Sequence, residues 1–160
     1  MSNIDRRKPI IHEGGFVRMD NRISLYNLLG YHSDKALQVQ PATLDIYRKL
    51  REHKHNCEGS YNHNKTWMSY ERLSVELSIS SKTVSKHVGI LERVGLVSIE
   101  RKYRNNRRNY MITINEPMSE PEFRAAYPEV IDKYYEELGK ILDDREGWNP
   151  WYERKGKKFS

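Results

Sequence analysis

Residues with hydrogen-bonding or cationic side chains gather at the start of one predicted helix. They are Ser81, Lys82, Thr83, Ser85 and Lys86. Hydroxyl and ammonium groups can hydrogen-bond to base edges in the DNA major groove and to the phosphates beside it. We therefore predict that this polar face meets base edges. The alternative is that these residues form the solvated face of an ordinary amphipathic helix. For a helix considered on its own, that would be the better interpretation.

A basic segment follows later in the chain. It contains Arg101, Lys102, Arg104, Asn105, Asn106, Arg107 and Arg108. Side chains this cationic repel one another unless a polyanion or solvent screens them. Asparagine tolerates the positive φ of a tight turn. We predict a hairpin turn over residues 103–109 whose arginines contact the DNA backbone or the minor groove.

Flanking residues predict how the polar face is held. Val84, Val88 and Leu91 follow helical spacing, so the opposite side of the helix should be buried. Ser80 is a suitable N-cap and Gly95 a suitable stop. A shorter helix is expected to begin after a second N-cap, Ser69, and to fix the angle of the polar helix. It offers Leu73 and Leu77 to the core, with Ile79 in the turn.

The spacing changes to a period of two after Leu96. Val97 and Ile99 alternate with polar residues, and Tyr110, Ile112 and Ile114 alternate with Met111 and Thr113. Alternation of this kind predicts two antiparallel strands. The elements thus run helix, turn, helix and basic hairpin.

This pattern resembles the winged helix-turn-helix domains of bacterial, plasmid and phage DNA-binding proteins. That group includes transcriptional regulators and the N-terminal domains of replisome organisers and replication initiators. The resemblance covers residues 36–115 and is carried by Leu73 to Leu77, Ile79, Ser80, Thr83, Val84, Val88, Leu91, Gly95 to Val97, Asn109 and Tyr110. It implies an α+β, mostly helical fold with double-stranded DNA as partner, preceded by an extension (1–35) and followed by a C-terminal segment (116–160).

The same module serves several roles, so fold alone does not select one. The first is a sequence-specific regulator, most simply a repressor that occupies an operator. The second is a plasmid or phage replication initiator or replisome organiser that binds origin repeats and a replication partner. The third is a structural DNA or RNA binder with little sequence preference. We expect the first, because the chain shows no large second domain.

Charge is distributed unevenly along the 160 residues, whose net charge is +6. Residues 81–110 hold eight Lys or Arg against two acids, whereas residues 116–146 hold four against ten. The basic half suits a polyanion and a salt-sensitive affinity. The single cysteine, Cys57, cannot form an internal disulfide, and no apolar run is long enough for a membrane span. We expect a cytoplasmic protein without a cofactor.

The sequence gives little support for a metal site or for an enzymatic activity. His53, His55, Cys57 and His63 are ligand types that zinc accepts, but their spacing matches no common zinc motif. We predict a solvated loop there, no metal site, and no enzyme, since the common nucleotide-binding and hydrolase motifs are missing. His87, on the polar helix, is expected either to touch phosphate or to face solvent.

The two ends of the chain supply further elements. We predict a flexible arm at residues 1–9, a short strand at residues 15–19, a short helix over residues 23–29 and an amphipathic helix over residues 43–54. A helix over residues 128–145 carries an apolar stripe that includes Ile131, Tyr134, Leu138 and Ile141. Such a stripe can pack on its own domain or pair two subunits, and we favour a homodimer. The aromatic and basic tail beyond it could bind DNA or a partner protein, or dock on the core.

Overall fold

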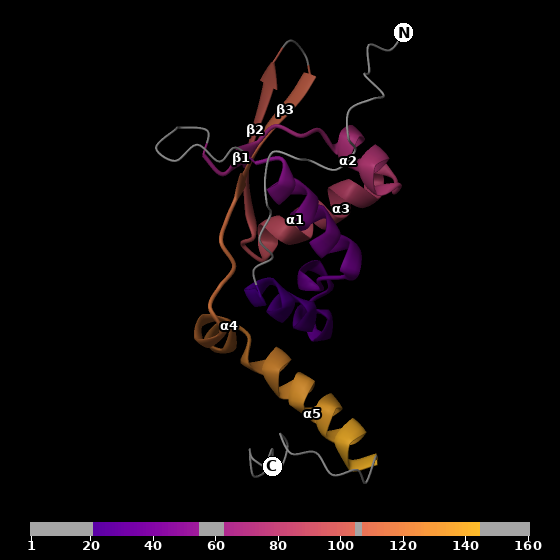
Figure 1. The fold of residues 1–160 in the computed structure, drawn as a ribbon, viewed down its shortest axis with the longest axis vertical. Helices are drawn as coiled ribbons and strands as arrows, with labels where there is room; N and C mark the ends of the chain where they lie inside the picture. The colour runs from indigo at the N-terminus through magenta and orange to yellow at the C-terminus, as the bar shows by residue number, and fades with distance from the viewer. Residues whose placement is uncertain (1–20, 55–62, 105–106, 145–160) are drawn as a thin grey trace. The chain divides into compact units, whose positions relative to one another are not determined.

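The computed structural model describes residues 21–54, 63–104 and 107–144, with backbone alone at 21, 102–104, 107–109 and 142–144. These residues form two compact units: one spans residues 41–116, and the other joins residues 21–40 to the chain from Pro117 onward. The described chain is mostly helical with one small antiparallel sheet, which confirms the α+β class (Figure 1). The predicted division at residues 35 and 115 stays a prediction.

The first unit combines helices with a three-stranded sheet. Its elements are α1 (Pro41–Glu52), β1 (Lys65–Thr66), α2 (Tyr70–Leu77), α3 (Ser81–Arg93), β2 (Val97–Arg104) and β3 (Arg107–Ile114). The strand order is β1-β3-β2 with both pairings antiparallel. The order of helix, turn, helix and hairpin agrees with the sequence pattern. The amphipathic helix α1 was expected over residues 43–54 and begins and ends two residues earlier.

The β2–β3 hairpin is longer than the sequence suggested. Cross-strand pairing continues through Tyr103 and Arg108 to Arg104 and Arg107. The predicted seven-residue turn over 103–109 is therefore wrong. Its polar composition indicated a loop, but a hairpin end needs no alternating apolar residues when the backbone ladder alone keeps the strands paired.

Serine caps and one glycine set the helix ends, as predicted. The Ser69 hydroxyl accepts from the Arg72 amide, and the Ser80 hydroxyl accepts from the Thr83 amide at 3.1 Å. Gly95 has φ +83°, and the amide of Leu96 donates to the Leu91 carbonyl at 2.9 Å. This pairing, with Gly95 donating to Glu92, is the Schellman arrangement that ends a helix.

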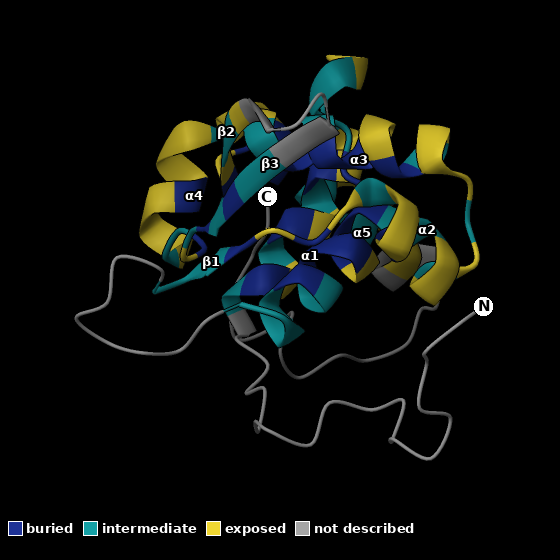
Figure 2. Cartoon of the chain, turned by 90° about the horizontal axis from the view of Figure 1, so that it is seen from above, coloured by how far each residue is buried: buried dark blue, intermediate teal, exposed yellow. Residues whose placement is uncertain are grey.

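The core of the first unit lies where α1, α3 and the sheet meet. Leu44, Leu50, Val84, Leu91 and Ile112 are fully buried, and the buried stretches of α1 and α3 are dark blue in Figure 2. Burying an aliphatic side chain of this kind contributes about 1.5–3 kcal/mol before entropy is counted. The core therefore fixes α3 against α1 and leaves its other side in solvent.

His87 lies on the buried face of α3, so both expectations for it were wrong. The residue is 3% exposed, and its Nδ1 lies 2.7 Å from the Thr43 hydroxyl on α1. The physical reason is its position: His87 precedes Val88 and follows Val84 by three residues, which places it on the apolar side. A buried polar ring needs a partner, and Thr43 supplies one.

The second unit is helical in its described part. It contains η1 (Asn21–Tyr31) and η2 (Lys35–Leu37), which are 3-10 helices, with α4 (Glu120–Ala126) and α5 (Pro128–Asp144). The helix expected over residues 23–29 is thus present, but it is longer and of the 3-10 type. Tyr26 packs edge-on against Phe123, with ring centroids 5.4 Å apart, and its hydroxyl accepts from the amide of Met118 at 3.0 Å.

Several expectations fall on residues outside the described ranges. These are the N-terminal arm, the strand over residues 15–19, His55, Cys57 and the aromatic tail beyond residue 144. Among the described helices, none is long and apolar enough to cross a membrane.

Candidate nucleic-acid interface

Four of the five polar residues predicted on α3 are exposed together. Ser81, Lys82, Ser85 and Lys86 stand on the solvent side of the first turns of α3. Thr83 differs, because it is half-buried and its hydroxyl lies 2.8 Å from the Ser80 hydroxyl. Its side chain is therefore engaged in the cap at the start of the helix. The remaining four residues form a compact polar surface with two ammonium groups.

The turn before α3 is held by short polar contacts. Ser78 ends α2 in the left-handed conformation, with φ 56°. The Ile79 amide donates to the Ser74 carbonyl at 3.1 Å, and the Ser74 hydroxyl donates to the Ile79 carbonyl at 2.5 Å. Ser80 then caps α3 directly. This chain of bonds fixes the angle between α2 and α3, which a helix that enters a groove requires.

The arginine-rich segment occupies the far half of the β2–β3 hairpin. Arg104 pairs with Arg107 in the register, Tyr103 with Arg108, and Lys102 with Asn109. Asn105 and Asn106 fall outside the described residues. The structure thus brings the backbone positions of the predicted arginines together at one end of a single hairpin. Their predicted contact with DNA stays a prediction.

Arg101 is exposed but engaged by a carboxylate. Its two terminal nitrogens donate to the two oxygens of Glu92 on α3, at 2.8 and 3.1 Å. The hydrogen bond from Arg101 lowers the pKa of Glu92, and the same bond raises the pKa of Arg101. Sequence spacing could not reveal this pair, because its members lie on different elements.

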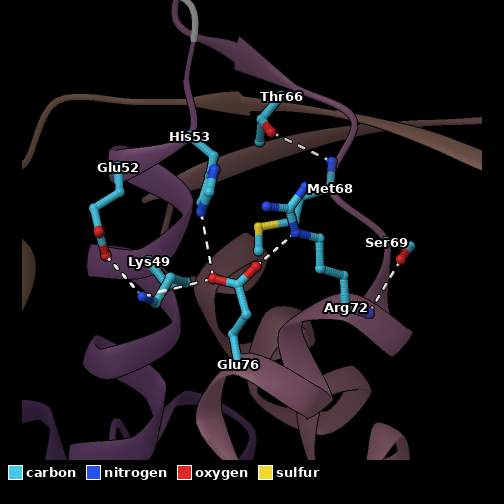
Figure 3. A network of polar contacts seen from close by, with 8 residues as sticks. All are labelled: Lys49, Glu52, His53, Thr66, Met68, Ser69, Arg72 and Glu76. Atoms are coloured by element: carbon cyan, nitrogen blue, oxygen red, sulfur yellow. Dashed lines mark hydrogen bonds and ion pairs between the residues drawn. The ribbon is translucent and has the colours of Figure 1, made fainter. Parts of the chain in front are cut away.

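A second polar network, between α1 and α2, was not predicted at all (Figure 3). The Glu76 carboxylate lies 2.5 Å from Arg72 Nε, 3.7 Å from Lys49 Nζ and 3.4 Å from His53 Nε2. Burial acts to raise the pKa of Glu76, but the Arg72 hydrogen bond and the nearby positive charges outweigh it, so the pKa is lowered. Only the spacing of Arg72 and Glu76 within one helix could have signalled part of it. The network stabilises the angle between α1 and α2.

His53 therefore has a partner other than a metal. The two central members of the predicted cluster, His55 and Cys57, fall outside the described residues, and His63 lies beyond that gap. Within the described ranges, no group of three or more potential ligands is close enough to hold a metal ion.

The apolar stripe of α5 is covered at its start and open farther along. Val130 and Ile131 are buried, Tyr134, Tyr135 and Leu138 are half-buried, and Ile141 is 53% exposed. Lys133 and Lys140 both pair with Glu136 and Glu137 within the same helix. The predicted use of this stripe as a subunit interface stays a prediction.

Comparison with known proteins yields one structural likeness. No family model and no curated protein matches the chain. The solved structure of a possible transcriptional regulator from Methanosarcina mazei Go1 is similar over 77% of this chain and 89% of that chain, with 16% identity and a TM-score of 0.42. A likeness at this level does not carry a function from one protein to the other.

Proposed function

We propose that the protein binds double-stranded DNA as a winged helix-turn-helix. The start of α3 enters the major groove, and the β2–β3 hairpin lies against the backbone or the minor groove. The observation that carries this proposal is the exposed set Ser81, Lys82, Ser85 and Lys86, on a helix whose other face is buried. A solvated helix face is the alternative, but it would not need a fixed turn before it or a basic hairpin after it.

The contacts around α3 support an interface that is ready before DNA arrives. The caps, the Ser74–Ile79 bonds and the Thr43–His87 bond hold the helix in one orientation. Side chains on a helix held in this way lose little backbone freedom when they bind, so less binding energy is spent on ordering.

The distribution of charge supports a polyanionic partner. Residues 81–110 carry an excess of six positive charges over negative ones, by the counts of Lys, Arg, Asp and Glu in that segment. Each phosphate contact releases condensed counterions, so affinity should fall as salt concentration rises. The acidic segment after residue 116 is not part of the proposed interface.

For the biological role, we propose a sequence-specific regulator that represses by occupying an operator. Ser81, Lys82, Ser85 and Lys86 are groups that can discriminate bases by hydrogen bonding. Operator occupancy needs only the DNA-binding unit, whereas initiation needs a further surface for a helicase or its loader.

Selection from a randomised double-stranded DNA library tests the proposal. The expected result is enrichment of one sequence, which footprinting then locates, together with an affinity that falls steeply with salt. A library that emerges unenriched would point to structural binding without sequence preference. Chromosomal mapping then separates the roles: a site beside a promoter supports regulation, and iterated sites at an origin support initiation. Absence of binding to any duplex would refute the proposal.

A further inference from the structure

The pair of Glu92 and Arg101 joins the last turn of α3 to the middle of β2. Two parallel hydrogen bonds, at 2.8 and 3.1 Å, make the contact bidentate. Bidentate arginine–carboxylate pairs fix an orientation as well as a distance, because both groups are planar. This pair therefore constrains the direction in which the hairpin leaves α3.

Aromatic rings back the same guanidinium. Arg101 pairs with Tyr110 across the hairpin, and its guanidinium carbon lies 5.8 Å from the centre of the Tyr110 ring. Tyr110 in turn meets Tyr70, the first residue of α2, with ring centroids 5.7 Å apart in an edge-to-face arrangement. Burial raises the pKa of the Tyr70 hydroxyl. These residues connect α2, α3 and both strands.

The position of Arg101 along the strand explains why a tie is needed there. Val97 is buried against the core and Ile99 is half-buried, whereas Arg101, next on the same face, is exposed. The apolar row that attaches the hairpin to the core thus ends before Arg101. Beyond it, β2 continues to Arg104, where the predicted DNA-contacting arginines lie.

We propose that Arg101 is a positioning residue rather than a DNA contact. With Glu92 as its partner and Tyr110 beneath it, Arg101 sets the angle of the hairpin relative to α3, and thereby the spacing between groove contacts and backbone contacts. This inference rests on the proposed DNA binding. It differs from the sequence-based prediction, which places Arg101 among the residues that touch DNA.

The pair is exposed enough that its role should be local. The side chains of Arg101 and Glu92 are 48% and 35% exposed, and pairs of this kind change overall stability little. We therefore expect Arg101→Gln and Glu92→Gln to leave the melting temperature nearly unchanged. Each should weaken binding to the selected duplex by up to about fivefold. This ratio of affinities corresponds to the interaction free energy of an exposed ion pair.

The sign of the Glu92→Gln effect separates the two roles. If Arg101 touched DNA, freeing it from Glu92 would strengthen binding, whereas loss of a positioning pair weakens it. Glu71→Gln is the matched control, because Glu71 is exposed on α2 and its substitution also removes one negative charge. The double variant Arg101→Gln with Glu92→Gln should bind DNA no more weakly than whichever single variant binds less tightly, because both substitutions remove the same interaction.

A charge exchange provides the decisive arm. The double variant Glu92→Arg with Arg101→Glu rebuilds the pair in reverse, so we expect it to restore affinity toward that of the unaltered protein. A direct DNA contact predicts the opposite, since a carboxylate would then face the phosphates. Stronger binding by Glu92→Gln than by Glu71→Gln, or further weakening by the exchange, would overturn the proposal.

Hydrogen exchange tests the positioning without DNA. Amides of β2 and β3 near Arg101 should exchange faster in Arg101→Gln and Glu92→Gln, and should recover their protection in the charge-exchanged variant. Unchanged exchange in all variants would overturn the positioning role even if the protein binds DNA. If the unaltered protein binds no duplex while exchange behaves as expected, the proposed function fails and the structural tie stands.

Discussion

Backbone conformation at Gly95 determines how α3 passes into β2. Its φ of +83° is costly for any other residue, and a Cβ built there would meet nothing within 4 Å. We therefore predict that Gly95→Ala lowers the free energy of unfolding by about 1–2 kcal/mol, through conformation alone. Gly89→Ala is the matched control, since Gly89 lies within α3 and the nearest atom to its Cβ would belong to the Arg93 side chain, at 3.5 Å.

Urea denaturation of both alanine variants supplies the measurement. Gly89→Ala should raise the free energy of unfolding by up to about 1 kcal/mol, because alanine favours a helix over glycine. Equal effects of the two substitutions would contradict the conformational role of Gly95.

Protonation of His87 should make stability depend on pH. Burial lowers the pKa of His87, and the charge of Lys86 lowers it further. The unfolded chain then binds a proton at a higher pH than the folded protein does. The stabilising contribution is complete above about pH 6.5 and is lost as the pH falls through that value toward the lower folded pKa.

The expected signature is a free energy of unfolding that declines as the pH falls from about 7.5 through 6.5, with a slope of up to about 1.4 kcal/mol per pH unit. His87→Asn, which keeps a polar atom near Thr43 but does not titrate, should flatten the curve over that interval. An equally steep decline in His87→Asn would show that another group is responsible.

Residue roles set by local sequence could be predicted, and those set by tertiary contacts could not. Ser69 and Ser80 act as N-caps because the groups they bind lie three residues away. Helical spacing alone places His87 on the apolar face of α3, but the hydroxyl that its ring contacts belongs to Thr43, which lies 44 residues earlier. The residues near His87 in the sequence do not indicate that Thr43 is its partner.

Among the elements, α3 carries the prediction closest to specificity. Lys82→Ala or Lys86→Ala should weaken binding to the selected duplex by about 1–3 kcal/mol for each base that the ammonium group reads directly. Both side chains are exposed, so circular dichroism should show an unchanged fold. Lys140→Ala on α5 removes the same charge outside the interface and should have little effect. Unchanged affinity for both α3 variants would remove α3 from the interface.

The hairpin should contribute affinity without sequence preference. Replacing Arg104, Arg107 and Arg108 with glutamine is expected to weaken binding to selected and unrelated duplexes together. The plot of log affinity against log salt should flatten by about 0.9 for each phosphate that the hairpin no longer neutralises. If only selective binding fell while the salt slope stayed the same, the hairpin would instead be reading bases.

The order of the elements was predictable because the spacing of apolar residues or a capping residue marks each one in the sequence. The helical spacing of Val84, Val88 and Leu91 and the alternation in β2 are local signals. The true length of the hairpin was not predictable, since the pairing of Tyr103 with Arg108 uses backbone groups that any residue supplies. The contact of Arg101 with Glu92, and those of Glu76 with Lys49 and His53, connect residues far apart in the sequence, so sequence spacing could not place them.

At the scale of the whole molecule, the apolar stripe of α5 predicts a dimer. Ile141 is 53% exposed and Tyr134 and Leu138 are half-buried, so the second half of the stripe stays partly open to solvent and is available to a second subunit. Sedimentation equilibrium of the full chain should show a concentration-dependent dimer that Ile141→Glu dissociates. Val75→Glu, at an apolar residue 79% exposed on α2, is the matched control and should leave the dimer intact. A monomer at all concentrations would return α5 to covering its own unit.

The central claim is that the start of α3 and the β2–β3 hairpin together form the DNA-binding surface. Amide chemical shifts of the isotope-labelled full chain, followed while the selected duplex is added, test it most directly. The claim predicts changes concentrated at Ser81 to Lys86 and along the far half of the hairpin, with α5 little affected. Changes confined to α1 or α5, with α3 and the hairpin unmoved, would contradict it.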